Sequence, residues 1–124
     1  MNKTKTPTEP MVNELDVIAA AMLDKKAQRV CTLDLRKPGA SICDHFVICN
    51  ADSSTQVAAI ADYVEERMYL QCRRKPRRSQ GKENAFWVII DYEDIVVHIF
   101  QTIYRSFYRL EELWADADVK HYTE

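Results

Sequence analysis

Glycine is scarce in this chain, with Gly39 and Gly81 as the only two in 124 residues. The phosphate-binding loops of dinucleotide-binding and P-loop proteins need glycines at close, set spacings, so nucleotide-binding loops of these kinds are excluded. Long apolar runs are also missing. The longest helix-compatible run, residues 17–23, is far shorter than the roughly 20 residues that span a bilayer. The sequence therefore predicts no membrane-spanning helix and no membrane partner.

Export and redox motifs are missing as well. Lys3 and Lys5 are followed by two prolines and Glu9 where a secretory signal would place its apolar stretch. No C-x-x-C pair occurs among the four cysteines, Cys31, Cys43, Cys49 and Cys72. We expect reduced, structural thiols in a cytoplasmic protein, with zinc ligation and disulfides as alternatives. The N-terminal residues contain no arginine, which favours a bacterial over an organellar protein.

Charge is unevenly distributed along the chain, although the net charge is only -2. Residues 73–82 contain six basic residues and no acid, which leaves 11 basic against 19 acidic residues elsewhere. The acidic remainder favours a basic partner. The basic segment is either a solvated connection or an RNA contact, for which the candidates are Arg73, Arg74, Arg77 and Arg78.

Apolar spacing predicts a single α/β domain. Residues 1–11 are expected to form a flexible tail, residues 12–114 the domain with a basic loop at 73–84, and residues 115–124 an acidic tail. Asn13 is placed to cap a helix that ends near Arg29, and Ser53 with Gln56 forms an S-x-x-Q capping box for a second helix. The predicted strands are 30–36, 45–50 as a central strand, 86–90 and 95–100, and residues 103–114 have helix-like spacing. The order predicts a mixed sheet of four or five strands flanked by helices.

The last two strands are predicted to form a hairpin with Tyr92 and Glu93 as its loop residues. In this register, three cross-strand pairs form: Asp91 with Asp94, Ile89 with Val96, and Trp87 with His98. One face is then wholly apolar and should pack on helices; its residues are Phe86, Val88, Ile90, Ile95, Val97 and Ile99. The other face mixes an indole, an imidazole and two carboxylates, a composition typical of a protein interface. The alternative is that a helix covers this face too.

Catalytic patterns are weak. Two carboxylates at i and i+2 on one strand would suit a divalent metal, but Asp34 has Arg36 at that spacing. No G-x-S-x-G turn occurs, and His98 is expected to pack rather than act as a base. We predict no catalytic residue, no metal site and no cofactor.

Several blocks resemble the ribosomal silencing factor family, also called RsfS or Iojap. They are Leu33 to Arg36, SICDHFVIC from Ser41, SSTQVAAIA from Ser53, WVIIDYEDIVVHIF from Trp87 and YRLEELW from Tyr108. The resemblance covers residues 12–114. It implies a nucleotidyltransferase-like fold without the catalytic residues. It also implies a translation repressor that binds ribosomal protein L-fourteen on the large ribosomal subunit and blocks small-subunit joining when nutrients are limited.

Residues at the family's motif positions are Asp44, Phe46, Trp87, Asp91, Asp94, His98, Leu110, Glu111, Leu113 and Trp114. Ribosomal proteins are basic, so we expect the carboxylates to make charged contacts and Trp87 to supply buried area. The candidate ribosomal-protein contacts are Trp87, Asp91, Tyr92, Asp94, His98 and Glu111. The family usually has glycine where Glu93 stands, which indicates a positive φ there.

Two other functions remain open from the sequence. An RNA-binding module would use the basic loop, with nearby ribosomal RNA as its target. A nucleotidyltransferase-like enzyme is suggested only by the fold relationship. A homodimer is also plausible, and it would hide the same surface that docks on the ribosome.

Overall fold

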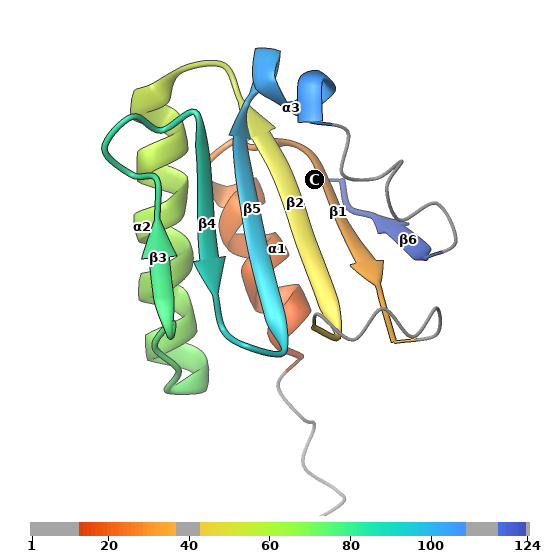
Figure 1. Cartoon of the computed structure of the whole chain (residues 1–124). Helices are drawn as coiled ribbons and strands as arrows, with labels where there is room; N and C mark the ends of the chain where they lie inside the picture. The colour runs from red at the N-terminus through yellow and green to blue at the C-terminus, as the bar shows by residue number, and fades with distance from the viewer. Residues whose placement is uncertain (1–12, 37–42, 109–116, 124) are drawn as a thin grey trace, which may run out of the picture.

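The computed structural model describes residues 13–36, 43–108 and 117–123. Within them the chain forms three helices and six strands in one α/β domain (Figure 1). The elements are α1 (Glu14–Asp24), β1 (Gln28–Asp34), β2 (His45–Ala51), α2 (Ser54–Cys72), β3 (Arg78–Gln80), β4 (Trp87–Asp91), β5 (Ile95–Gln101), α3 (Thr102–Tyr108) and β6 (Asp118–His121). Among these helices, none has the length and apolar character needed to cross a membrane.

The strands form one mixed sheet in the order β3-β4-β5-β2-β1-β6. β2 and β5 run parallel, and every other neighbouring pair is antiparallel. The predicted mixed sheet flanked by helices is confirmed, but it has six strands rather than four or five. The strands that the sequence did not locate are the two edges, β3 in the expected basic loop and β6 in the expected acidic tail. All residues of both are exposed, so neither shows the apolar alternation of a half-buried strand.

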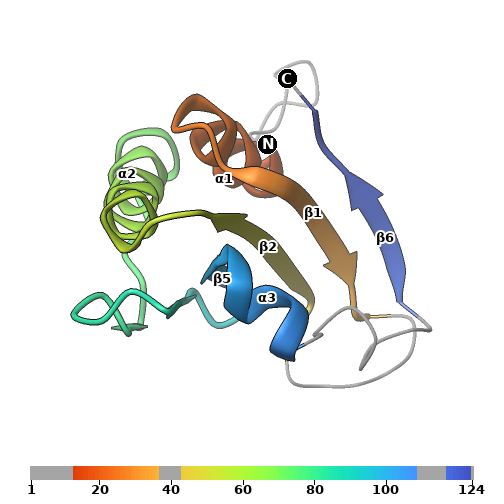
Figure 2. The same ribbon diagram turned by 90° about the horizontal axis from the view of Figure 1, so that it is seen from above.

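α1 and α2 cover one face of the sheet (Figure 2). As predicted, Asn13 caps α1, with its side chain accepting a hydrogen bond from Asp16 N at 3.2 Å. The predicted end near Arg29 is wrong, because α1 ends at Asp24 and β1 begins at Gln28. Lys26 has a positive φ where the chain leaves the helix, and Arg29 has a positive φ inside β1, where the register with β2 shifts between Gln28 and Cys31.

The capping box of α2 is only half formed. Ser53 Oγ accepts from Gln56 N at 3.1 Å, as the motif predicts. The Gln56 side chain does not reach back to Ser53, and instead donates to Lys25 O at 3.1 Å and Lys26 O at 3.3 Å. The start of α2 is thereby joined to the turn between α1 and β1.

The core lies on both faces of the sheet. β2 is confirmed as a central strand, since all its residues after His45 are buried. Between the sheet and the helices, side chains from β2, β4 and β5 pack against α1 and α2. The opposite face has a smaller buried cluster that includes Leu33, Phe46, Ile48 and Phe100.

All four cysteines lie in the described part of the chain and form no disulfide. Cys31, Cys43 and Cys49 are buried and pack as small hydrophobic residues. Burial raises the pKa of Cys43 to about 11, so its thiol stays protonated at neutral pH.

The predicted hairpin register is wrong by two residues. Asp91 pairs with Val96, Ile89 with His98, and Trp87 with Phe100. The connection is longer than the two residues expected, and Tyr92 N donates to Ile95 O at 2.8 Å. A shift of two preserves the alternation of side chains, so the strand residues stay on the faces assigned from the sequence.

Phe86 departs from the predicted apolar face. It precedes β4 and is 47% exposed, and its ring lies 4.9 Å from that of Tyr104. The other residues of that face are buried against the helices, as predicted; they are Val88, Ile90, Ile95, Val97 and Ile99.

The turn between β4 and β5 contains a strained residue. Glu93 has φ 82°, the conformation for which glycine is favoured. Asp91 Oδ1 accepts a hydrogen bond from Glu93 N at 2.7 Å and stabilises this turn. The position therefore fits the glycine that the family resemblance led us to expect.

Replacing Glu93 by glycine is expected to raise the free energy of unfolding by about 1 kcal/mol, because glycine adopts a positive φ without the steric cost of a Cβ. The exposed Arg77–Glu93 ion pair, at 3.6 Å, offsets little of this gain. Urea unfolding followed by circular dichroism measures the difference. Glu93→Ala is the matched control, since it removes the carboxylate and keeps the Cβ. An equal gain in both variants would contradict the explanation.

Candidate functional site

The candidate surface lies on the sheet face opposite α1 and α2, which Figure 1 views directly. Three side chains of β4 point to this face and are half-buried: Trp87, Ile89 and Asp91. Val96 lies beside them on β5 and is also half-buried. α3 lies on the same side of the sheet, over the other end of β5 (Figure 2). We call Trp87, Ile89, Asp91 and Val96 the β4–β5 strip.

An aromatic cluster holds Trp87 in place. Its indole Nε1 donates to His98 Nδ1 at 3.0 Å, and its ring stacks on Phe100 with centroids 5.0 Å apart. The Phe46 and His98 rings meet edge to face, with centroids 4.5 Å apart. The indole therefore has a fixed orientation, as a pre-formed binding surface requires.

His98 supports this cluster as a neutral side chain. Burial lowers its pKa from 6.5 to about 4, so the imidazole is uncharged at neutral pH. Because Nδ1 accepts from Trp87, the proton lies on Nε2, which is buried and has no hydrogen-bond partner among the described residues. The neutral imidazole is packed within the aromatic cluster, between Trp87 and Phe46.

Arg74 connects the β4–β5 turn to the rest of the domain. Its guanidinium donates to Asp94 Oδ1 at 2.8 Å, to Tyr92 O at 2.6 Å and to Glu14 Oε1 at 2.5 Å. The three partners come from the turn and from the start of α1, which lie at the same end of the molecule as the end of α2 (Figure 1). Burial alone would raise the pKa of Asp94, but hydrogen bonding to Arg74 and its positive charge outweigh burial and lower it.

Asp91 has an arginine partner of its own. Arg77 Nη2 donates to Asp91 Oδ2 at 2.8 Å, and Arg77 N donates to Asp91 O at 2.7 Å. Arg78 lies directly opposite Asp91 in the β3–β4 pair. Burial raises the pKa of Asp91, but the Arg77 hydrogen bond is among several contributions that together lower it.

The carboxylates of the hairpin and the arginines that follow α2, which the sequence analysis considered separately, therefore pair with one another. The hairpin carboxylates, expected to face a basic protein, are paired with Arg74 and Arg77, which were expected to face RNA. Arg73 and Arg78 are exposed, and neither makes an ion pair within the described part of the chain. Sequence reasoning missed this network because its members are distant in the chain and none has helical i, i+4 spacing.

The other predicted contact residues differ in accessibility. Tyr92 and His98 are only 2% and 5% exposed. Asp94 keeps 48% of its side chain exposed. Glu111 lies outside the described residues, as do the other motif positions Leu110, Leu113 and Trp114.

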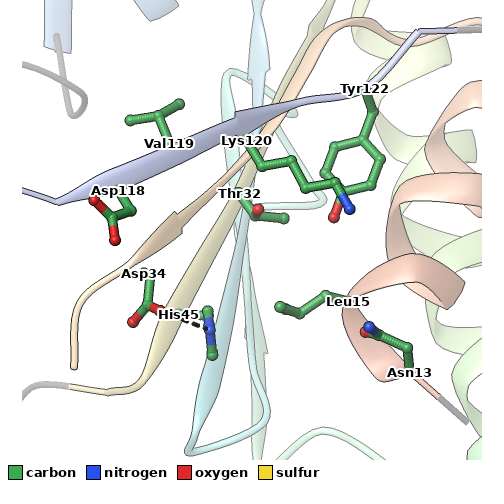
Figure 3. Close-up of a pocket in the computed structure, with 9 residues that line it drawn as sticks. All are labelled: Asn13, Leu15, Thr32, Asp34, His45, Asp118, Val119, Lys120 and Tyr122. Carbon is green, nitrogen blue, oxygen red and sulfur yellow. Dashed lines mark ion pairs between the residues drawn. The ribbon is translucent and has the colours of Figure 1, made fainter. Parts of the chain in front are cut away.

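A separate cavity of about 240 Å³ lies between the start of α1 and strands β1 and β6 (Figure 3). Its lining residues are Asn13, Leu15, Thr32, Asp34, His45, Asp118, Val119, Lys120 and Tyr122. Asp34 Oδ2 is 3.9 Å from His45 Nε2, and Arg36 bonds the same carboxylate at 2.7 Å. Residues 13–36, 43–108 and 117–123 contain no cluster of three or more His, Cys, Asp or Glu side chains that could hold a metal ion.

Comparison with known proteins relates the chain to factors that act on ribosomes. Residues 8–124 match the family described as "Ribosomal silencing factor during starvation". The ribosomal silencing factor RsfS of Bacillus subtilis is 38% identical over 104 residues, which cover 83% of this chain and 86% of that protein.

Two further relatives support the comparison. The crystal structure of protein CV0518 from Chromobacterium violaceum is similar with a TM-score of 0.78 and 26% identity, covering 93% of this chain and 95% of that one. The mouse protein "Mitochondrial assembly of ribosomal large subunit protein 1" is 27% identical over 103 residues, which are 82% of this chain and 45% of that protein.

Replacing Arg74 by glutamine is expected to lower the free energy of unfolding by about 2 kcal/mol, because two carboxylates and a carbonyl lose a charged donor. Urea unfolding at pH 7 measures the loss. Arg77→Gln is the matched control: it is the same substitution at an arginine that is 62% exposed, and we expect a much smaller loss. Equal losses in the two variants would argue against Arg74 as the main connection.

Replacing His98 by phenylalanine is expected to change how stability depends on pH. The folded pKa, about 4, lies below the 6.5 of an ordinary histidine, so between these values the unfolded chain binds more protons. Wild-type stability should fall as pH is lowered from 6.5 to about 4, by at most about 1.4 kcal/mol per pH unit from this group. His98→Phe should fall less over the same window in urea unfolding series. Identical pH profiles would show that His98 is not the titrating group.

Proposed function

The chain belongs to the ribosomal silencing factor family, and we propose that it binds ribosomal protein L-fourteen on the large ribosomal subunit and thereby blocks joining of the small subunit. Its family regulates translation by silencing ribosomes. The family's description names starvation, which supports repression under nutrient limitation. The name of the mouse relative refers to the large ribosomal subunit, which supports that subunit as the target.

The β4–β5 strip is the surface that we propose for docking. The observation that carries this proposal is that Trp87, Ile89 and Val96 stay partly exposed on a sheet face that α1 and α2 leave open. Aromatic and aliphatic side chains at the centre with polar groups at the rim are typical of protein interfaces. Trp87 is also oriented by His98 and Phe100, so little ordering remains to be done on binding.

Charge makes a smaller contribution than the sequence suggested. Asp91 and Asp94 are paired with arginines, so their attraction for a basic ribosomal protein is partly neutralised. Glu93 pairs more loosely with Arg77, at 3.6 Å, and 76% of its side chain is exposed beside the strip. In this proposal the apolar part of the strip supplies most of the affinity and Glu93 and Asp94 favour a basic partner.

Silencing of this kind requires occupancy of a surface rather than chemistry. A domain bound at the joining face prevents contact sterically, and no catalytic residue, metal or cofactor enters the proposal. We also propose a location in the bacterial cytoplasm; the Bacillus subtilis relative supports a bacterial source.

Replacing Ile89 by aspartate is expected to lower affinity for the large subunit at least tenfold, because a desolvated charge would lie in the apolar centre of the interface. Co-sedimentation with purified large subunits through a sucrose gradient measures binding. Recovery of joined ribosomes on adding small subunits measures silencing.

Val119→Asp is the matched control for this test. It introduces the same charge on the edge strand β6, at a residue that is 42% exposed and lies outside the β4–β5 strip. It should bind like wild type. Wild-type binding by Ile89→Asp, or equal loss in both variants, would remove the strip from the proposal. Charge reversal at Asp91 or Asp94 is a poorer test, because a lysine there would face Arg77 or Arg74 and perturb the fold.

A further inference from the structure

The end of α2 carries an exposed aromatic ring flanked by two cations. Tyr69 is 44% exposed, and the neighbouring Leu70 is 50% exposed. The Arg73 guanidinium lies 5.7 Å from the centre of the Tyr69 ring, and Lys75 Nζ lies 5.5 Å from it. We call Tyr69, Arg73 and Lys75 the basic–aromatic cluster.

Local backbone structure builds this cluster. Arg73 ends α2 in the left-handed conformation, with φ 56°, and its N–H donates to Tyr69 O at 3.0 Å. Arg74 N donates to Met68 O at 3.3 Å, so the chain folds back over the last turn of the helix. Pro76 restricts Lys75 to extended conformations. Both cations are thereby directed to the same ring.

This cluster differs from the other tyrosine–cation pairs in the described part of the chain. In each of those pairs a carboxylate accepts a hydrogen bond from the tyrosine hydroxyl or from the cation. The pairs are Lys25–Tyr63 with Asp24, Arg74–Tyr92 with Glu14 and Asp94, and Lys120–Tyr122 with Asp16. Among the described residues, Arg73 and Lys75 have no carboxylate within ion-pair distance, although both are exposed.

The neighbouring charges do not neutralise the cluster. Glu65, one turn earlier on α2, accepts from Lys82 at 2.7 Å and from Ser79 at 2.9 Å. Glu66 is exposed and is the one other acid on this turn of the helix, while Arg67 adds a further positive charge. The end of α2 is thus locally positive on a chain whose remainder is acidic.

We propose that the basic–aromatic cluster binds RNA, with Arg73 and Lys75 contacting phosphates and a base stacking on the Tyr69 ring. Proteins that bind single strands combine cations along the backbone with aromatic rings on which bases stack. This inference rests on the proposed function, which places the chain on a ribosomal surface that exposes RNA. Arg74 and Arg77, which the sequence suggested as RNA contacts, are not part of this proposal, because their guanidinium groups are paired with carboxylates.

The cluster is placed to act together with the docking strip. The end of α2 and the β4–β5 turn lie at the same end of the molecule (Figure 1). Arg74 and Arg77, which follow Arg73 by one and four residues, connect the two through Asp94 and Asp91. Because α2 lies on the opposite face of the sheet from the strip, a chain bound through the strip leaves the cluster accessible to RNA at this end of the molecule.

Fluorescence anisotropy with a labelled single-stranded RNA of 12 nucleotides and mixed sequence tests the proposal. Replacing both Arg73 and Lys75 by glutamine should weaken binding at least tenfold and reduce the slope of log affinity against log salt by about 1.4, since each phosphate contact contributes about 0.7. Tyr69→Ala should weaken binding about tenfold. Tyr69→Phe should bind within twofold of wild type, because it keeps the ring.

Replacing both Lys25 and Lys26 by glutamine is the matched control. It removes two exposed cations and a tyrosine–cation contact elsewhere on the surface, with the same change in net charge. It should bind RNA within twofold of wild type. Absence of RNA binding by the wild type, or equal losses in the control and the Arg73–Lys75 variant, overturns the proposal. Binding to phosphatidylglycerol vesicles in place of RNA also overturns it.

Large-subunit co-sedimentation of the same variants separates this inference from the proposed function. If RNA binding is absent while co-sedimentation persists and still depends on Ile89, only the RNA contact is wrong. If the wild type fails to co-sediment but binds RNA through Tyr69, Arg73 and Lys75, the proposed function is wrong and the cluster stands.

Discussion

The ion pairs of Arg74 hold together the end of the molecule at which the β4–β5 turn and the basic–aromatic cluster lie. One guanidinium joins the start of α1, the end of α2 and the β4–β5 turn. The side chains of Arg74, Glu14 and Asp94 are 28%, 29% and 48% exposed, so the pairs form at a partly solvated site. Desolvation there costs less than in a core, and a network of several charges is more favourable than an isolated surface pair. The turn is thus fixed to the helical layer as well as to the sheet.

Arg74 also has consequences for recognition. A charged side chain engaged by two carboxylates and a carbonyl is poorly available to a phosphate. The same pairing weakens the field of the hairpin carboxylates. What remains accessible is the apolar centre of the β4–β5 strip on one side and the basic–aromatic cluster on the other. The internal ion pairs therefore separate a surface suited to protein from a surface suited to RNA, although their residues are interleaved in the sequence.

The sequence predicted the parts of the fold whose side chains are buried in a regular pattern. The central strand β2, the capped helix α2 and the apolar face of the hairpin follow from apolar periodicity and from the Ser53 cap. The edge strands β3 and β6 bury no side chain, so no periodicity marks them. The register of the hairpin was wrong because turn length is set by local bonds, such as that between Asp91 and Glu93 N, which pattern alone does not reveal. The candidate contact residues Trp87 and Asp91 lie on the predicted sheet face because the register error was an even number of residues. The Arg74 network was missed because it depends on tertiary contacts.

The departure from glycine at position 93 fits this account of the turn. A carboxylate at a positive φ carries a steric cost, and the structure compensates with the Asp91–Glu93 hydrogen bond and with Arg77 beside both side chains. The basic segment after α2 supplies that arginine and supplies Arg74 for Asp94. The acidic turn and the basic segment thus stabilise one another, and each would leave uncompensated like charges without the other. Arg73 and Lys75 are not needed for this compensation, which is why their exposure beside Tyr69 is better explained by a partner than by the fold.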